Sequence, residues 1–200
     1  MKNASFIVLE GIDGSGKSTQ ATLLSERFAK EGLECISLAE PSNGSYGIRI
    51  REMLTGTPLP VQEQLELFML DREDDAKRNI RPALEKGITV ILDRYYFSNA
   101  AYQGALGLDP FFILNENKRC GFPEPNKVFF IDITPETAIE RITKRQGEER
   151  EIFEKKEFLH KVRENFISIM DERCVIINGA QEIKTIHSEI ISNIDFLHYK

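Results

Sequence analysis

The residues with the clearest chemical potential form a glycine-rich segment near the N-terminus. It reads Gly11-Ile12-Asp13-Gly14-Ser15-Gly16-Lys17-Ser18 and is followed by Thr19. The segment satisfies G-x-x-x-x-G-K-[ST] between an apolar run and a stretch with helical spacing, which is the setting of a P-loop. Backbone N–H groups of such a loop turn toward phosphate oxygens, and the helix start adds partial positive charge. We expect these residues to bind a nucleoside triphosphate, with Lys17 at the β- and γ-phosphates and the Ser18 hydroxyl on Mg²⁺.

A second group with chemical meaning is Asp93-Arg94-Tyr95, which follows the apolar run Ile88 to Leu92. In parallel sheets, ligands collect at the carboxyl ends of the strands. Arg94 is therefore expected to offer a rigid fork to an acceptor phosphate, and Asp93 to lie close to Mg²⁺. The alternative is a surface ion pair, which contributes little by itself.

Both groups need a sheet to position them, and the spacing of apolar residues predicts one. The short apolar runs are Phe6 to Leu9, Cys35 to Ala39, Ile88 to Leu92, Val128 to Ile133 and Cys174 to Ile177. Segments with helical spacing separate the runs, among them Lys17 to Glu31, Val61 to Lys86, Pro135 to Arg145, Lys155 to Asp171 and Gln181 to Leu197. This alternation predicts an α/β, three-layer P-loop NTPase fold with a five-stranded parallel sheet flanked by helices. We find no linker or repeat and expect a single domain over residues 1–200.

Composition excludes several classes of function. The formal net charge of −6 over 200 residues argues against a non-specific nucleic-acid binder, which needs a basic face. Cys35, Cys120 and Cys174 show no C-x-x-C spacing, so neither a disulfide framework nor a zinc site is predicted. The N-terminus enters a strand-like run without a signal sequence. We therefore expect a cytoplasmic protein that binds neither nucleic acid nor membranes.

The P-loop alone leaves the acceptor open, because GTPases, ATPases and small-molecule kinases share it. A regulatory GTPase would carry a D-x-x-G turn after its third strand and an N-K-x-D guanine reader. Neither pattern is present, and Val128 to Ile133 is followed by Thr134 and Pro135.

Several separate segments together resemble the thymidylate kinase family. These are the runs from Phe6 to Gly14, Phe68-Met69-Leu70-Asp71-Arg72, Asp93-Arg94-Tyr95 and Ser98-Asn99-Ala100-Ala101-Tyr102-Gln103-Gly104. With the order of elements, the resemblance covers Phe6 to about Ile194. Deoxynucleoside kinases, which share the general plan, are better known for serine where this chain has Tyr95. The resemblance implies that ATP and Mg²⁺ serve to convert dTMP to dTDP in dTTP biosynthesis.

For the acceptor base, the resemblance implies that Phe68 stacks on thymine. Arg72, one helical turn further along, would face the same cavity and donate to the base O4. Gln103 would help to hold the base edge.

For the rest of the acceptor, the resemblance implies that Asn99 and Tyr102 line the deoxyribose and exclude a 2′-hydroxyl. Asp13 would accept a hydrogen bond from the 3′-OH, and Arg51 would join Arg94 on the 5′-phosphate. The chain departs from the family where many members read R-E-P-G-G-T, because it has Ala39-Glu40-Pro41-Ser42-Asn43-Gly44. The phosphate contacts of this loop are therefore left open, with Arg49 or Tyr46 as possible substitutes.

The resemblance also implies a lid over ATP at about residues 141–152. Some members carry a basic residue in the P-loop where this chain has Gly14, and others place the catalytic arginine in the lid. We therefore expect Arg145 and Arg150 to be catalytic, with Arg141 and Lys144 assisting. Asn178 lies where family members contact adenine. The resemblance further implies a homodimer.

Two alternatives remain at this point. One is another deoxynucleotide or deoxynucleoside kinase. The other is a P-loop nucleotide switch without an acceptor.

Overall fold

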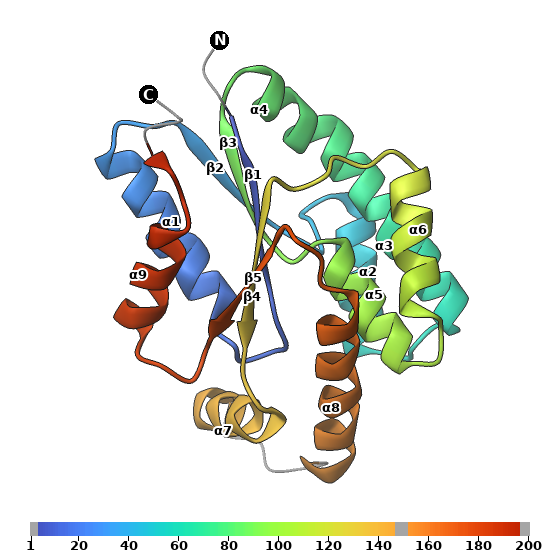
Figure 1. Ribbon diagram of the computed structural model, residues 1–200. Coiled ribbons are helices and arrows are strands. Elements are labelled where there is room, and N and C mark those ends of the chain that lie inside the picture. The colour runs from blue at the N-terminus through green and yellow to red at the C-terminus, as the bar shows by residue number, and fades with distance from the viewer. Residues whose placement is uncertain (1–3, 147–151, 197–200) are drawn as a thin grey trace.

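The computed structural model describes residues 4–146 and 152–196, and its centre is a sheet of five strands (Figure 1). The strands are β1 (Phe6–Glu10), β2 (Cys35–Ala39), β3 (Thr89–Asp93), β4 (Lys127–Asp132) and β5 (Cys174–Asn178). All neighbouring pairs are parallel, in the order β2-β3-β1-β4-β5. The predicted five-stranded parallel sheet is confirmed. Its third strand begins one residue later than the apolar run, because Ile88 N–H instead donates to Ala83 O at the end of the preceding helix.

Helices cover both faces of the sheet. They are α1 (Lys17–Lys30), α2 (Ser45–Thr55), α3 (Val61–Asp75), α4 (Arg81–Glu85), α5 (Tyr96–Ala105), α6 (Pro110–Arg119), α7 (Pro135–Gln146), α8 (Ile152–Ile169) and α9 (Ile183–Ser192). Successive strand residues point to opposite faces, and β1 shows this alternation. Phe6 and Val8 pack with α3, α5 and α8, whereas Ile7 and Leu9 pack with α1 and α9. Figure 1 shows these two helical layers on either side of the strands.

The predicted long helix from Val61 to Lys86 is not continuous. A π-helical segment, η1 (Ala76–Ile80), separates α3 from α4, and Arg81 N–H donates to Ala76 O five residues back. Pro82, which follows, has no N–H, and its ring excludes the carbonyl four residues earlier. The backbone widens by one residue at this point, as π-helical turns do.

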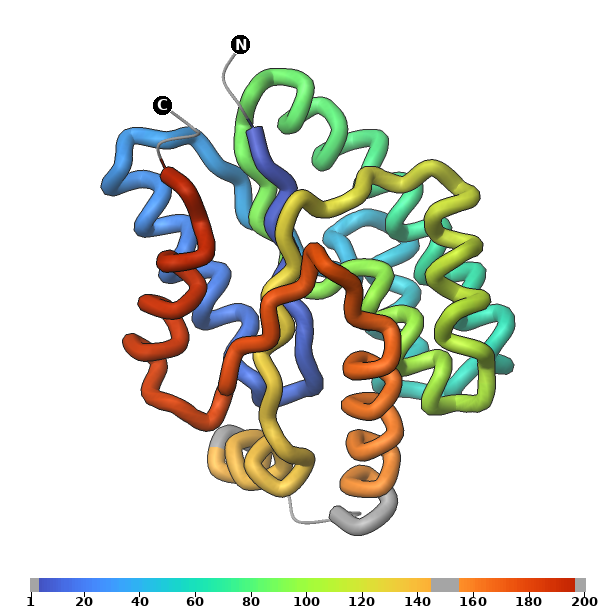
Figure 2. The backbone as a smooth tube through the Cα atoms, in the orientation of Figure 1, coloured from blue at the N-terminus to red at the C-terminus, as the bar shows by residue number. Residues whose placement is uncertain are grey.

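The segments that carry the predicted chemistry meet at one edge of the sheet. Figure 2 shows β1 and β4 ending at the same edge, beside α7 and the start of α1. This edge is formed by the carboxyl ends of the strands, where parallel sheets bind ligands. The P-loop, Asp93 and Arg94 all lie there, because each directly follows or ends a strand.

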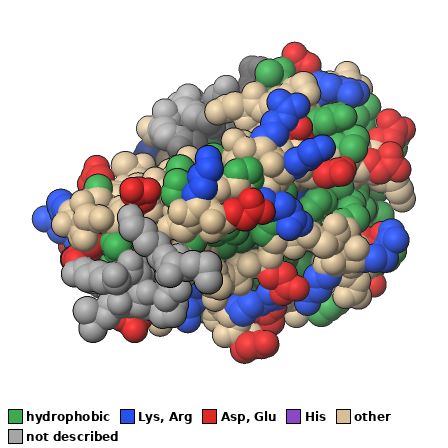
Figure 3. All heavy atoms as spheres, turned by 90° about the horizontal axis from the view of Figure 1, so that it is seen from above, with side chains coloured by type: hydrophobic (Ala, Val, Ile, Leu, Met, Phe, Trp, Pro, Cys, Tyr) green, Lys and Arg blue, Asp and Glu red, His purple; other side chains and the backbone are tan. Residues whose placement is uncertain are grey.

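The described surface fits the charge balance. Viewed from above, at the opposite end of the molecule from α7, acidic and basic side chains are interspersed (Figure 3), and this face shows no continuous basic area. Within residues 4–146 and 152–196, no helix combines the length and apolar character needed to cross a membrane.

Candidate active site

The P-loop connects β1 to α1 by a tight path through positive φ angles. Gly11, Gly14 and Gly16 have φ values of 148°, 81° and 103°. Gly14 also lacks space for a side chain, because a Cβ there would lie 2.9 Å from Ala138 O in α7. Glycine at position 14 therefore permits both the loop conformation and the close approach of α7.

Lys17 spans the inside of this loop. Its Nζ donates to Ile12 O at 2.9 Å and lies 3.4 Å from Ser15 Oγ. Burial lowers the pKa of Lys17 to about 8, with Arg94 adding to the effect, although Asp93 and Asp13 oppose it. The side chain is thus held among carbonyl and hydroxyl oxygens at the position where triphosphate oxygens would arrive.

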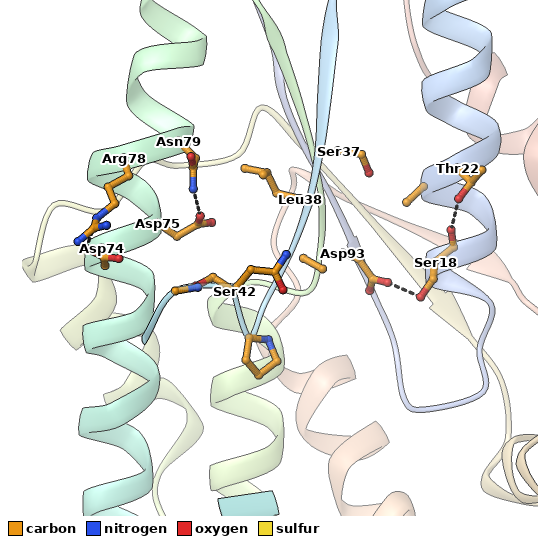
Figure 4. Close-up of a pocket in the computed structure, with 15 residues that line it drawn as sticks. Ser18, Thr22, Ser37, Leu38, Ser42, Asp74, Asp75, Arg78, Asn79 and Asp93 are labelled. Carbon is orange, nitrogen blue, oxygen red and sulfur yellow. Dashed lines mark hydrogen bonds and ion pairs between the residues drawn. The ribbon is translucent and has the colours of Figure 1, made fainter. Parts of the chain in front are cut away.

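Ser18 and Asp93 face each other across the cleft between α1 and β3. Ser18 Oγ donates to Asp93 Oδ2 at 2.5 Å, and Figure 4 shows the two side chains pointing toward one another. The second carboxylate oxygen, Asp93 Oδ1, is buried without a hydrogen-bond partner in the described part of the chain. Mg²⁺ prefers one or two protein oxygens and takes its other ligands from water and phosphates. The hydroxyl and the unpartnered carboxylate oxygen fit that requirement.

Three or more His, Cys, Asp or Glu side chains arranged around a metal ion are not found among the described residues.

Arg94 links the P-loop to a second cleft. Among the described residues it is the one non-glycine with positive φ, at 71°. Its Nη2 lies 2.5 Å from Asp13 Oδ1, its Nη1 donates to Ser98 Oγ at 3.1 Å, and the guanidinium lies 5.1 Å from the Tyr102 ring centroid. Burial alone would raise the pKa of Asp13, but the positive charges of Arg94 and Lys17 hold it below its ordinary value.

A cavity of about 170 Å³ adjoins this pair, between the P-loop, α3 and α5. It is lined by all but one of the residues predicted to contact the acceptor, namely Asp13, Phe68, Arg72, Arg94, Asn99, Tyr102 and Gln103. Two of its amides are ordered by a direct contact, because Asn99 Nδ2 donates to Gln103 Oε1 at 2.7 Å. The cavity therefore combines aromatic surfaces with directed polar groups, as small-molecule sites do.

Arg72 is held firmly at the wall of this cavity. It is only 1 % exposed, its Nη2 lies 2.5 Å from Glu40 Oε2, and its Nη1 donates to Asn117 Oδ1 at 2.7 Å. Its guanidinium also lies 5.1 Å from the Tyr95 ring centroid. Burial raises the pKa of Glu40, while the adjacent Arg72 charge opposes that rise. Glu40 and Asn117 were not among the predicted site residues, and only the position of Glu40 in the β2–α2 loop hinted at a role.

Arg51 is the predicted acceptor residue that does not line the cavity. It is exposed on α2, and its Nη1 donates to Pro41 O at 2.9 Å and Ser42 O at 2.8 Å. Asp71 holds the same loop, accepting from Ser42 N–H at 2.7 Å and from Ser42 Oγ at 2.6 Å. The loop that departs from the family pattern is therefore fixed by contacts of its own.

Ala39, the position of the missing arginine, ends β2 and pairs in register with Asp93. It lines an open cavity of about 560 Å³ that Ser18 and Asp93 also line and that lies on the β2 side of their contact (Figure 4). Ser42 and Asn79 also line this cavity.

Two basic lid residues, Arg141 and Lys144, have described contacts. Lys144 Nζ binds Glu140 Oε1 at 2.7 Å on the exposed side of α7, whereas Arg141 contacts the P-loop. From α7, its Nη1 donates to Gly14 O at 3.3 Å and its Nη2 to Gly179 O at 2.9 Å. With the P-loop it lines a cleft of about 380 Å³. Asn178 does not line this cleft, and its Oδ1 accepts from Ala180 N–H at 3.0 Å.

The remaining lid residues are described only in part. Arg145 belongs to the last turn of α7, and its side chain lies outside the described residues, as does Arg150. The predicted lid at 141–152 is thus described only at its two ends.

The two clefts meet at the Arg94–Asp13 pair. A triphosphate in the P-loop and a planar anionic molecule in the 170 Å³ cavity would present their phosphates to each other beside Lys17 and Arg94. Such an arrangement suits phosphoryl transfer, in which alignment and charge neutralisation supply most of the catalysis.

Comparisons with known proteins agree with this geometry. The family model described as "Thymidylate kinase" matches residues 9–190. A protein of Archaeoglobus fulgidus named "Probable thymidylate kinase" is 39% identical over 97% of this chain and 97% of its own length. A "Thymidylate kinase" of Desulfotalea psychrophila is 41% identical over 94% of this chain and 93% of its own length. A "Probable thymidylate kinase" of Thermococcus kodakarensis is 37% identical over 96% of this chain and 98% of its own length.

Proposed function

The chain belongs to the thymidylate kinase family, and we propose that it transfers the γ-phosphate of Mg-ATP to dTMP, forming dTDP for dTTP biosynthesis. One observation carries the proposal to the level of this chain's own residues. Seven residues from the P-loop, α3, the β3–α5 connection and α5 line a single cavity that opens beside Lys17 and Arg94.

The acceptor oxygen of dTMP is ionised at neutral pH, so the reaction needs no general base. Lys17 and Arg94, which line the same cleft, neutralise the charge of the transferring phosphoryl group. Ser18 and Asp93 would hold Mg²⁺, which when bound supplies further neutralisation of the β- and γ-phosphate oxygens. Each of these groups is positioned before substrate arrives, because Lys17 contacts Ile12 O and Arg94 contacts Asp13.

The thymine base is read by residues of α3 and α5. Phe68 stacks on the ring, Arg72 donates to O4, and Gln103 holds the base edge. The Glu40 contact supports this assignment, because it fixes the direction of the Arg72 guanidinium before the base binds.

The sugar and the 5′-phosphate occupy the end of the cavity nearest the P-loop. Tyr102 and Asn99 line the deoxyribose, and Asp13 accepts from the 3′-OH. Arg94 binds the 5′-phosphate, and Arg51 joins it if the β2–α2 loop rearranges, since its guanidinium now contacts Pro41 O and Ser42 O.

On the donor side, the nine P-loop residues Gly11 to Thr19 surround the phosphates of ATP. Arg141 contacts the nucleotide from α7. Asn178, the last residue of β5, would contact the adenine end of the nucleotide, outside the 380 Å³ cleft. The lid at about 141–152 contributes Arg145 and Arg150 to the transferring phosphoryl group and excludes water. Gly14 in the P-loop carries no charge, which supports the assignment of the positive charge at the transferring phosphoryl group to the lid.

We also propose a cytoplasmic homodimer built from one domain over residues 1–200. Its support is an exposed apolar surface on the α3 side, where Leu70 is 41 % exposed beside a shallow cavity lined by Met69 and Phe122. Sedimentation of the wild type and of Leu70→Glu tests it. A dimer that Leu70→Glu dissociates supports the surface, and a wild-type monomer refutes it.

Release of ADP with dTMP, dUMP, thymidine and dCMP as separate acceptors tests the proposed reaction. We expect the highest kcat/KM with dTMP. Turnover of thymidine without turnover of dTMP would identify a deoxynucleoside kinase. Release of ADP that no acceptor stimulates, with nucleotide-dependent partner binding, would identify a P-loop switch.

A further inference from the structure

The Glu10 side chain ends β1 immediately before the P-loop and is fully buried. Its Oε1 accepts hydrogen bonds from Tyr95 N–H at 2.8 Å and Ser98 N–H at 3.2 Å. Its Oε2 accepts from the Ser98 hydroxyl at 2.5 Å. The P-loop pattern begins one residue later, so the motif itself gives this carboxylate no role.

These hydrogen bonds are those of a helix N-cap. The capped helix, α5, follows β3, whereas the capping carboxylate belongs to β1. Tyr95 is the N-cap residue of α5, but its own side chain makes no capping hydrogen bond. Ser98 is the third residue of the helix, whose N–H a capping side chain ordinarily accepts. A carboxylate at this end also interacts favourably with the helix dipole. Glu10 of β1 therefore supplies the cap that α5 lacks.

The cap matters because Arg94 directly precedes Tyr95, the N-cap residue of α5. Its φ of 71° is unfavourable for a residue with a side chain, so the surrounding structure must hold it there. Glu10 fixes the N–H of Tyr95, the next residue, and the Ser98 hydroxyl that donates to Glu10 also accepts from Arg94 Nη1 at 3.1 Å. One carboxylate thus restrains both the backbone and the guanidinium of Arg94.

We propose that Glu10 is the positioning residue of Arg94, which it holds toward the acceptor phosphate by capping α5 from β1 and by orienting the Ser98 hydroxyl. The inference rests on the proposed function, because the acceptor phosphate is that of dTMP. Glu10 itself touches neither substrate.

The charges around Glu10 agree with this role. Burial raises its pKa to about 7, although the Ser98 hydrogen bond and the Arg94 charge lower it. Lys17 of α1 and Arg72 of α3 also act on it through their charges. Protonation on the acid side removes the acceptor that orients the Ser98 hydroxyl, so Arg94 loses its restraint.

Glu10→Gln keeps the shape and one acceptor oxygen of the cap but removes the charge. At about pH 8 we expect kcat with dTMP to fall about tenfold or more, as for a displaced catalytic group. The KM for ATP should stay within about twofold, because the P-loop is unchanged. The decline of kcat below about pH 7 should disappear in the variant. Its thermal transition should not drop, because a buried charge has been removed.

Ser98→Ala removes only the hydroxyl between Glu10 and Arg94 and should lower kcat in the same direction by a smaller factor. Ser168→Ala, which removes an exposed hydroxyl that donates to Asn165 O on α8, is the matched control and should leave kcat unchanged. Wild-type kcat and an unaltered acid limb in Glu10→Gln overturn the proposal. If that variant does not fold, wild-type kcat in Ser98→Ala overturns it.

Failure of the wild-type protein to phosphorylate dTMP would refute the proposed function instead. A crystal structure of Glu10→Gln then reports on Arg94 independently of the acceptor. Movement of its guanidinium away from Asp13 supports the positioning role, and an unchanged Arg94 contradicts it.

Discussion

Arg94 Nη2 lies 2.5 Å from Asp13 Oδ1, so a residue at the end of β3 is tied directly to a residue inside the P-loop. The pair stands where the phosphate cleft and the 170 Å³ cavity meet. The Asp13 carboxylate can accept a hydrogen bond from a hydroxyl of the substrate while Arg94 stays next to the substrate's phosphate. Donor and acceptor sites thus share one ion pair.

Replacing Asp13 with Asn should weaken dTMP binding. A hydrogen bond to a charged group contributes about 1.5–3 kcal/mol, so we expect the KM for dTMP to rise about ten- to a hundredfold. The comparison substrate is 3′-deoxy-dTMP, which lacks the hydroxyl in question. If the substitution raises the KM for 3′-deoxy-dTMP as much as the KM for dTMP, Asp13 does not bind the 3′-OH.

Arg72→Ala should raise the KM for dTMP far more than the KM for ATP. It should also lower the free energy of unfolding by about 3–5 kcal/mol, because Glu40 is left buried without its partner. Denaturant unfolding measures that loss, and the double variant Arg72→Ala with Glu40→Gln should recover part of it. Equal changes in the two KM values, measured where both proteins are folded, would contradict base reading by Arg72.

Asp93→Asn should weaken Mg²⁺ activation. Loss of a carboxylate beside the metal typically lowers affinity or activity by about 10–100-fold, so the Mg²⁺ concentration at half-maximal rate should rise accordingly. Asp132→Asn is the matched control, because Asp132 also ends a strand but binds Arg163 at 2.6 Å. A normal Mg²⁺ response in Asp93→Asn would remove Asp93 from the metal site.

Binding of ATP should weaken as pH rises through about 8. The Lys17 pKa is lowered to about 8, so the ammonium is charged below that pH and neutral above it. The triphosphate binds the charged form, and its apparent Kd should increase about tenfold per pH unit well above the pKa. Titration of ATP binding between about pH 7 and 9.5 measures this dependence, with Lys17→Met as the control that should remove it. A flat profile in the wild type would show that Lys17 stays charged throughout.

The lowered pKa of Lys17 also affects the stability of the protein without nucleotide. Whereas ATP affinity falls with rising pH, the free energy of unfolding should rise. Between about pH 8 and 10.5, Lys17 is protonated in a larger fraction of the unfolded molecules than of the folded molecules. The contribution of this group to the free energy of unfolding therefore increases with pH over that interval.

Much of the fold follows from local patterns in the chain. Five apolar runs predict five parallel strands, because each is short, apolar and separated from the next by helical spacing. The break at η1 and the helix α6 were not predicted. Signals for both exist in Pro82 and in the Asp109-Pro110 start of α6, where Asp109 caps the helix by accepting from Phe111 N–H.

The site was less predictable, because its support comes from residues far apart in the chain. The role of Arg72 could be proposed from the family resemblance, with its spacing to Phe68 placing both on one helix face, but its partners Glu40 and Asn117 belong to other elements. Periodicity reports which face a residue occupies and not which distant side chain meets it. Glu10 was hidden for the same reason, since its partners follow a different strand.

The contact between Gly14 and Ala138 limits how this active site can change. A side chain at position 14 and α7 in its present place would occupy the same space. Exchanging a lid arginine for one in the P-loop would therefore require an outward shift of a whole helix, which one substitution does not deliver. An arginine engineered at position 14 of this chain would need a matching change in the residues that set the distance between α7 and the P-loop.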